Sequence, residues 1–330
     1  MSKDFIKLHI ENDSSLGEVF EVTPEKIVAA LARNPDLTDK LDWTIGYDCT
    51  RFEEQIASAN ALICWTIDTA NLVQRAPQLR WIHATGAGVE HFAPFDWLPD
   101  NITFTNNAGI HGERADEYAI MSVLMLNNRI PEMVTNQRAA RWEQTFNSSI
   151  NGKTLLVIGV GHVGSGVAKW AKKFGMRVLG VRRSGEAHPA VDEMHRPDAI
   201  PALVPKADFI FVATPATAHT HHLLGSAEIA TMRSGTGIVS YSRAAVIDYE
   251  ALRIRCKARE ISAILDVFDP EPLPANSPLW QTPNVIITPH CSSDDTDVYI
   301  PKTLDHVLTN MRRFLVSEPL KNRVDPALEY

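Results

Sequence analysis

Short hydrophobic runs alternate with amphipathic stretches along the first hundred residues. The hydrophobic runs are rich in residues that favour strands, and the stretches between them have apolar residues at helical spacing. Thr23 followed by Pro24 is typical of the start of a helix. This alternation predicts a parallel sheet flanked by helices. The predicted strands lie at residues 5–10, 43–48, 61–67, 79–85 and 102–106, and the predicted helices at residues 24–34, 51–59 and 70–77.

A second alternating series begins near residue 154 and predicts a doubly wound α/β fold. Between the two series, residues 113–133 are apolar on nearly every side of a helix until Pro131, so we expect that helix to be buried in the core or against a second subunit. The second series has predicted strands at 154–159, 177–181, 208–214, 237–242, 263–268 and 285–290, and predicted helices at 163–174, 226–233 and 248–260.

Charge and cysteine content narrow the class of protein. The 32 basic and 40 acidic residues give a net charge of -8, which argues against a dedicated nucleic-acid or anionic-membrane surface. The start of the chain lacks the apolar region of a signal peptide, and no apolar run reaches membrane length. The four cysteines have no CxxC spacing and are typical of thiols in a reducing compartment. We therefore expect a cytoplasmic protein that binds neither nucleic acid nor membrane.

A glycine pattern joins the first strand of the second series to its helix. The stretch "LLVIGVGHVGSG" (155–166) places Gly159, Gly161 and Gly164 in a Gly-x-Gly-x-x-Gly pattern. These glycines permit a tight turn, approach of a pyrophosphate, and close packing of helix on strand. The first N–H groups of the helix, at His162 and Val163, would face the anion. This pattern between a strand and a helix predicts a dinucleotide site.

The end of the next strand indicates which dinucleotide is bound. An acid at this place would accept hydrogen bonds from the ribose 2′-OH of NAD, but the residues here are Arg182, Arg183 and Ser184. Two guanidinium groups and a hydroxyl suit a 2′-phosphate, so NADP(H) is favoured. The alternative is that the arginines form a solvated strand end while Glu186 binds the ribose of NAD(H).

Three residues with catalytic chemistry follow later strands. Arg243 and His290 lie at or near the ends of predicted strands, and Glu271 comes a few residues after "AILDVF" (263–268). Ligands of an open parallel sheet bind outside the carboxyl ends of its strands, so we expect the three side chains to converge near the nicotinamide. The histidines of "HTHH" (219–222) have no carboxylate or cysteine at ligand spacing, and we expect no metal site.

Several motifs from about residue 80 onward carry a resemblance to a known family. They are "VIGVGHVGSGVAKWAKKFGMRVLG", "TPATAHTHHLLG", "MRSGTGIVSYSRAAVIDYEAL", "ILDVFDPEPLPANSPLW" and "NVIITPH", with weaker likeness in "ATGAGVEHF" and "NNAGIHGERADEYAI". In these motifs the chain resembles the D-isomer-specific 2-hydroxyacid dehydrogenases. The "RRS" stretch is most similar to the NADPH-using glyoxylate and hydroxypyruvate reductase branch of that family.

The resemblance implies a domain arrangement and an assembly. A Rossmann coenzyme domain at 104–292 would be inserted into a flavodoxin-like substrate domain formed by 1–103 and 293–330. Residues 299–316 have helical spacing and would pack on the substrate domain. The helix near 113–127 would be the contact of a homodimer, with Trp142 approaching the partner's active site.

The resemblance also implies roles for individual residues. His290 would be the general acid that protonates the 2-oxo oxygen, and Glu271 would orient its imidazole. Arg243 would bind the substrate's oxo group and carboxylate. The substrate is then a small 2-oxo acid, or the 2-hydroxy acid in reverse. Asp266 would accept a hydrogen bond from the nicotinamide carboxamide, Pro215, Thr220, Tyr241 and Ser242 would line the cofactor, and the N–H groups of Ala87 and Gly88 would bind the substrate carboxylate.

Some positions depart from the family pattern and keep alternatives open. Ala244 stands where the family has glycine after the arginine, "CSSDD" follows His290, and Asp116 replaces a usual alanine. These changes remove no catalytic group but bear on the identity of the substrate. The alternatives are an NADH-dependent enzyme of the phosphoglycerate or D-lactate type, and a dinucleotide-sensing protein like the corepressors built on this fold.

Overall fold

The computed structural model describes residues 5–330 and divides the chain into two compact units. One unit comprises Met1–His111 and Asp295–Tyr330, and the other comprises Gly112–Asp294. The first division differs from the expected one after residue 103, because β5 (Thr103–Thr105) is hydrogen-bonded to β4 as the edge strand of the first sheet. The chain therefore leaves the first unit only after that strand. The second division falls after Asp294 rather than after residue 292.

The first unit is a five-stranded parallel sheet with the strand order β2-β1-β3-β4-β5. Each of the five predicted runs overlaps a strand, and Thr23 caps α1 with Pro24 in the first turn, as predicted. The strands are β1 Ile6–Asn12, β2 Leu41–Tyr47, β3 Ala61–Cys64, β4 Trp81–Ala84 and β5; the helices are α1 Pro24–Ala32, α2 Phe52–Ile56, α3 Leu72–Arg75 and α10 Tyr299–Leu315, with 3₁₀ turns at Ser14–Leu16, Pro35–Lys40, Glu90–Phe92 and Phe95–Trp97.

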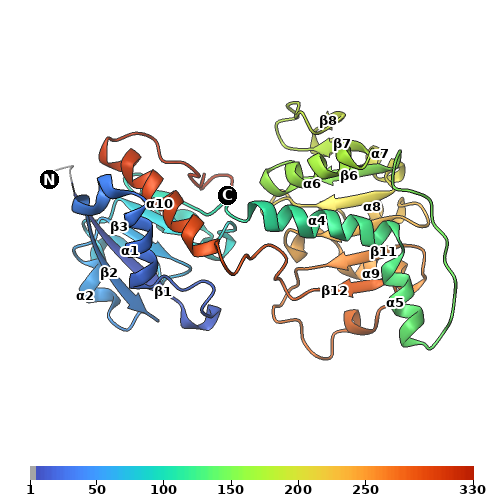
Figure 1. Ribbon diagram of the computed structural model, residues 1–330, viewed down its shortest axis with the longest axis horizontal. Helices are drawn as coiled ribbons and strands as arrows, with labels where there is room; N and C mark the ends of the chain where they lie inside the picture. Colours follow the sequence, from blue (N-terminus) through green and yellow to red (C-terminus); the bar gives the residue numbers. More distant parts are fainter. Residues whose placement is uncertain (1–4) are drawn as a thin grey trace. The chain divides into compact units, whose positions relative to one another are not determined.

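Helices cover both faces of this sheet. On one face, α1 and α10 lie side by side, and Ile27 and Leu304 pack in one cluster with Ile6 of β1 (Figure 1). On the other face, Phe52 of α2 and Leu72 of α3 pack in a cluster with residues of β3, β4 and β5. The helix predicted over 299–316 is thus confirmed as α10, and it supplies much of one core layer.

A buried histidine lies within this sheet. His83 of β4 is fully buried, its Nδ1 is 2.9 Å from Oγ1 of Thr105, and its Nε2 is 3.0 Å from Oδ1 of Asn107. The amide oxygen of Asn107 only accepts, so Nε2 carries the proton and Nδ1 accepts from the threonine hydroxyl. Burial lowers the pKa of His83 to about 3, from an ordinary value of 6.5.

We expect His83 to make the protein sensitive to acid. Because its folded-state pKa is lowered, its stabilising contribution is present above about pH 6.5 and is lost as the pH falls toward 3. Between pH 7 and pH 4 this contribution amounts to about 3 kcal/mol of the free energy of unfolding. In urea unfolding at both pH values, H83Q should therefore show a pH dependence smaller by about that amount. H219Q, at an exposed loop histidine, should keep the wild-type pH dependence, and an unchanged slope in H83Q would contradict the assignment.

The second unit is a seven-stranded parallel sheet with the order β12-β11-β10-β9-β6-β7-β8. Six of its strands coincide with the six predicted runs, and β8 is an edge strand that the hydrophobic pattern did not predict. The strands are β6 Thr154–Ile158, β7 Arg177–Val181, β8 Glu193–His195, β9 Phe209–Val212, β10 Gly237–Ser240, β11 Ser262–Leu265 and β12 Val285–Ile287.

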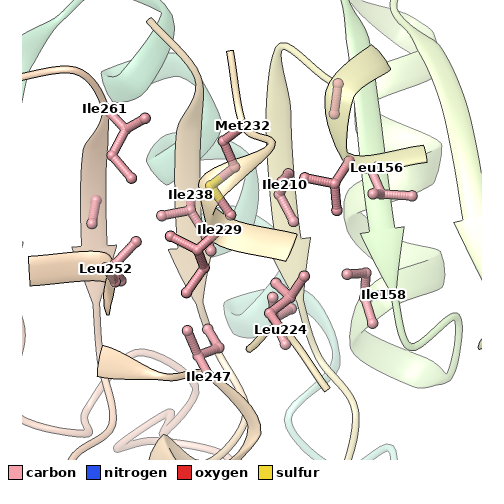
Figure 2. Packing of buried hydrophobic residues seen from close by; sticks show 14 of the residues in the cluster. Leu156, Ile158, Ile210, Leu224, Ile229, Met232, Ile238, Ile247, Leu252 and Ile261 are labelled. Atoms are coloured by element: carbon pink, nitrogen blue, oxygen red, sulfur yellow. The ribbon is translucent and has the colours of Figure 1, made fainter. Parts of the chain in front are cut away.

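Helices of the second unit pack on the two faces of its sheet. On one face, the side chains of Leu156, Ile210 and Ile238 from successive strands meet Ile229 of α8 and Leu252 of α9 (Figure 2). On the other face, α4 and α6 pack together over the sheet. The helices are α4 Gly112–Asn127, α5 Ile130–Arg138, α6 His162–Lys173, α7 Ile200–Leu203, α8 Ser226–Ala230 and α9 Tyr249–Lys257, with 3₁₀ turns at Pro197–Ala199, Val204–Lys206, Ala244–Val246 and Pro278–Gln281.

The long helix predicted over 113–133 is two helices. α4 ends at Asn127, and Arg129 adopts a left-handed conformation with φ of 55° before α5 begins. One side of α4 is buried in the core of its own unit, where Tyr118, Ala119 and Val123 pack against α6 and the sheet. Within residues 5–330, no helix is both long and apolar enough to cross a membrane.

Candidate active site

The glycine turn between β6 and α6 has the shape required for a pyrophosphate. Gly159 has φ of +97°, and a Cβ there would lie 2.6 Å from the backbone of Ala213. A Cβ at Gly164 would lie 1.9 Å from the carbonyl oxygen of Gly159, whereas a Cβ at Gly161 would meet no atom within 4 Å. α6 begins at His162, so its first N–H groups face this open space without helical partners. The turn therefore fits a dinucleotide.

Arg182, at the end of β7, braces the loop that follows it. Its Nε donates to the carbonyl oxygen of Glu186 at 2.8 Å, and its Nη2 donates to the carbonyl oxygen of Ala187 at 3.1 Å. Nη2 also lies 3.3 Å from Oε2 of Glu186. Arg183 and Ser184 are exposed on the same loop. The two arginines of the predicted phosphate site thus differ, because Arg182 is held by the loop's own carbonyl groups.

The loop after β9 contains the two other expected cofactor contacts. Oγ1 of Thr220 donates to the carbonyl oxygen of Pro215 at 2.7 Å and accepts from the N–H of Thr217 at 2.8 Å. These bonds close the loop at the same edge of the sheet as the glycine turn, because β9 is the direct neighbour of β6. Among residues 5–330, no group of three or more His, Cys, Asp or Glu side chains is placed to hold a metal.

His290 and Glu271 are paired at the ends of neighbouring strands. Nδ1 of His290 lies 2.7 Å from Oε2 of Glu271, and both side chains are partly exposed to solvent. Oε1 of Glu271 accepts from the N–H of Phe268 at 2.7 Å, which fixes the carboxylate on the loop after β11. A carboxylate partner requires a proton on Nδ1, so Nε2 is the nitrogen that faces any substrate. This arrangement can transfer a proton at Nε2.

Arg243 follows β10, the strand beside β11. Its N–H donates to Oγ of Ser242 at 2.5 Å, and its Nη1 donates to the carbonyl oxygen of Ser242 at 2.8 Å. Ala244, in place of glycine, begins a 3₁₀ turn and does not have a positive φ, so its backbone accepts a side chain. Arg243 is therefore brought to the same edge of the sheet as Glu271 and His290, each from its own strand end.

Asp266 is buried beneath this edge and is held by two hydroxyl groups. Its Oδ1 accepts from Oγ1 of Thr288 at 2.6 Å, and its Oδ2 accepts a very short bond from Ser292. Tyr118 of α4 reaches the same threonine, with 2.6 Å between the two oxygens. Burial raises the pKa of Asp266, and the two hydroxyl bonds oppose that effect. Sequence reasoning identified Asp266 but missed Thr288, Ser292 and Tyr118.

The remaining residues predicted to contact cofactor or substrate belong to different units, Tyr241 to the second and Ala87 and Gly88 to the first. Tyr241 packs between the rings of Tyr118 and Phe211, with ring centroids 5.4 and 5.5 Å apart, and its burial raises the pKa of its phenol. Ala87 and Gly88 belong to the first unit, after β4. Within residues 5–330 neither of their N–H groups donates a backbone hydrogen bond, which leaves both able to bind an anion.

Together the parallel sheet, the glycine turn and the His290–Glu271 pair define a dinucleotide-dependent dehydrogenase. A family model described as the D-isomer specific 2-hydroxyacid dehydrogenase NAD-binding domain matches residues 120–292, more than half of the chain. The chain belongs to this family and is an NAD(P)-dependent D-2-hydroxyacid dehydrogenase. The predicted family and fold are thereby confirmed.

Named relatives and solved structures are similar over most of the chain. The glyoxylate reductase of Thermofilum pendens is 28% identical over 249 residues, which are 72% of this chain and 73% of that protein. The glyoxylate/hydroxypyruvate reductase B of Klebsiella pneumoniae is 31% identical over 234 residues, 68% of this chain and 72% of that protein. A D-isomer specific 2-hydroxyacid dehydrogenase from Xanthobacter autotrophicus, solved with NADPH and MES, is 25% identical with a TM-score of 0.85, covering 98% of this chain and all of that one.

Proposed function

We propose that this enzyme reduces a small 2-oxo acid, of the glyoxylate or hydroxypyruvate kind, to the D-2-hydroxy acid with NADPH. The observation that carries the proposal is the 2.7 Å contact between Nδ1 of His290 and Glu271. Because the carboxylate engages Nδ1, the other ring nitrogen of this partly exposed imidazole, Nε2, is the one that can give a proton to the substrate. The relatives named glyoxylate and hydroxypyruvate reductases support the substrate class. The Xanthobacter structure, which holds NADPH, supports the cofactor.

The proposed mechanism assigns one task to each side chain. NADPH, when bound, supplies a hydride to the carbonyl carbon. His290 gives its Nε2 proton to the oxo oxygen, so that the carbonyl becomes an alcohol. Arg243 binds the carboxylate and the oxo oxygen, and its charge stabilises the negative charge that develops there. Glu271 holds the imidazole in place through Nδ1, since its other oxygen is fixed by the N–H of Phe268.

The residues proposed to hold the cofactor extend along one edge of the sheet. Asp266, held by Thr288 and Ser292, would accept from the carboxamide of the nicotinamide. The glycine turn would bind the pyrophosphate, and Arg183 with Ser184 would bind the 2′-phosphate. The other proposed contacts are His162 and Val163 at the start of α6, Pro215 and Thr220 after β9, and Tyr241 and Ser242 after β10; Ala87 and Gly88 are proposed to bind the substrate carboxylate.

Initial-rate kinetics on the purified enzyme test this function. Glyoxylate and hydroxypyruvate should be reduced, and kcat/KM should be at least about tenfold higher with NADPH than with NADH, since one charge-assisted phosphate contact is worth about 1.5–3 kcal/mol. A preference for NADH would contradict the cofactor and favour the phosphoglycerate or D-lactate type. Failure to reduce any acid in a 2-oxo acid panel, with NADPH binding intact, would favour a dinucleotide sensor.

We also propose that the enzyme is a homodimer. The side of α4 that faces away from its core carries Met121, which is 43% exposed. The chain between α5 and β6 forms a long loop (Figure 1) on which Trp142 is 94% and Phe146 is 85% exposed. Large aromatic side chains so exposed are typical of surfaces that another chain covers. A second copy that packs on α4 and this loop would bury them.

The four thiols support a reducing compartment, and we propose the cytoplasm. Cys49, Cys64, Cys256 and Cys291 are all free. Burial raises the pKa of the Cys256 thiol to about 12 and also raises that of Cys64, so neither is a reactive thiolate. Free thiols of this kind persist where glutathione and NADPH keep proteins reduced.

A further inference from the structure

We propose that Arg196, at the end of the edge strand β8, is a further ligand of the cofactor's 2′-phosphate and contributes to the choice of NADPH over NADH. The inference rests on the proposed NADPH preference and adds a residue to it. Arg196 follows the strand that the hydrophobic pattern did not predict, so its position beside the arginine loop was visible only in the structure.

The strand register places Arg196 beside the predicted phosphate site. β7 and β8 are parallel, and Val181 is paired with His195. Arg182 and Arg196 are therefore the residues that directly follow this pair, one after each strand. The N–H of Arg182 donates to the carbonyl oxygen of His195 at 3.1 Å, which extends the pairing past the last residue of each strand. The carboxyl ends of both strands therefore reach the edge where the glycine turn binds the dinucleotide.

Gly185 guides the side chain of Arg196 along the same loop. Gly185 has φ of +69°, and a Cβ built there would lie 3.0 Å from Cγ and 3.4 Å from Nε of Arg196. The stem of Arg196 thus passes directly over a residue next to Ser184, and its guanidinium is exposed at this surface. The absence of a side chain on Gly185 is what makes room for it.

The acids of this region are already engaged by other cations. Glu186 pairs with Arg182 at 3.3 Å, and Glu193 of β8 pairs with Arg177 and lies 3.6 Å from Nε2 of His195. Among residues 5–330, the Arg196 side chain forms no ion pair. Arg182 donates two hydrogen bonds to carbonyl oxygens of its own loop and so stabilises the loop conformation. The planar guanidinium of Arg196 can instead donate two parallel hydrogen bonds to a phosphate dianion.

Binding of nucleotide fragments measures this contribution without catalysis. By isothermal titration calorimetry, 2′,5′-ADP, which carries the 2′-phosphate, is compared with ADP, which lacks it. R196Q should weaken the binding of 2′,5′-ADP about tenfold while the affinity for ADP changes less than twofold. R196K, which keeps the charge and loses the fork, should restore part of the affinity. The tenfold difference should shrink in 0.5 M NaCl, because added salt screens an exposed ion pair.

R177Q is the matched control, because it removes the same charge from the opposite end of β7. R177Q should bind both fragments as the wild type does. If the wild type itself binds 2′,5′-ADP no more tightly than ADP, the proposed NADPH preference fails, and the role of Arg196 fails with it. If the wild type discriminates and R196Q discriminates equally well, only the assignment of Arg196 is overturned. Equal loss of both fragments in R196Q would show a structural role and would also overturn it.

Discussion

H290A should lower kcat for glyoxylate or hydroxypyruvate by about 10²–10⁴-fold, the range usual for the loss of a general acid. Without the imidazole, no side chain presents a proton to the oxo oxygen while negative charge develops there. Binding of NADPH, followed by its fluorescence, should remain within about threefold of the wild type, because the proposed dinucleotide contacts lie on other strands. A large fall in kcat with intact cofactor binding is the expected pattern.

C291S is a suitable control for H290A. It changes the neighbouring exposed residue of the same loop and removes no proton donor to substrate, so kcat should change less than about threefold. E271Q replaces the carboxylate that contacts Nδ1 of His290 with an uncharged amide of the same size. This variant should lower kcat by a smaller factor than H290A. Near-normal kcat in H290A would overturn the assignment of the proton donor.

R243A should lower kcat/KM for the 2-oxo acid by about 10³-fold or more. A guanidinium that binds the carboxylate supplies a charge-assisted bond worth about 1.5–3 kcal/mol, and stabilisation of the developing oxyanion adds about 2.7–4 kcal/mol. Both KM and kcat should therefore worsen, whereas H290A should act mainly on kcat. Steady-state kinetics over a wide range of substrate concentration separates the two effects.

R253Q provides the matched control for R243A. Arg253 lies on α9 of the same unit, where it forms an ion pair with Glu250 at 2.7 Å, and it is not one of the proposed substrate contacts. The control should leave both kinetic constants near the wild-type values. An R243A enzyme whose KM is unchanged would show that another group binds the substrate carboxylate.

The hydrophobic pattern predicted most strands because they are buried on both faces. β6, β9, β10 and β11 are almost continuous runs of buried apolar residues, and such runs are readable without any partner. β8 could not be read in this way, because its three residues lie at an edge and are exposed or half-buried. The break between α4 and α5 was also missed, although the polar residues Asn127, Asn128 and Arg129 interrupt the apolar pattern there. Arginine is not a residue type that favours the left-handed conformation which Arg129 adopts.

The residues of the candidate site also divide into those that the sequence pattern indicates and those whose contacts depend on the fold. Gly159, Arg243 and His290 were identified because their residue types are distinctive and they follow predicted strands. Thr288 and Ser292 are ordinary polar residues, and their contact with Asp266 exists only because β11 and β12 are neighbours. The hydrogen bonds of Arg182 to two carbonyl oxygens of its loop likewise depend on the loop conformation, which the sequence does not reveal.

The placement of α10 has a consequence for biosynthesis. The second unit, Gly112–Asp294, is one continuous stretch of the chain, so all of it is synthesised before α10. The first unit cannot complete its core until α10 has been synthesised, because Leu304 and Val307 of α10 pack in one core layer with Ile6 and Leu8. During translation the sheet of the first unit therefore has an uncovered apolar face while nearly two hundred further residues are added. We expect that interval to be when the growing chain most needs a chaperone.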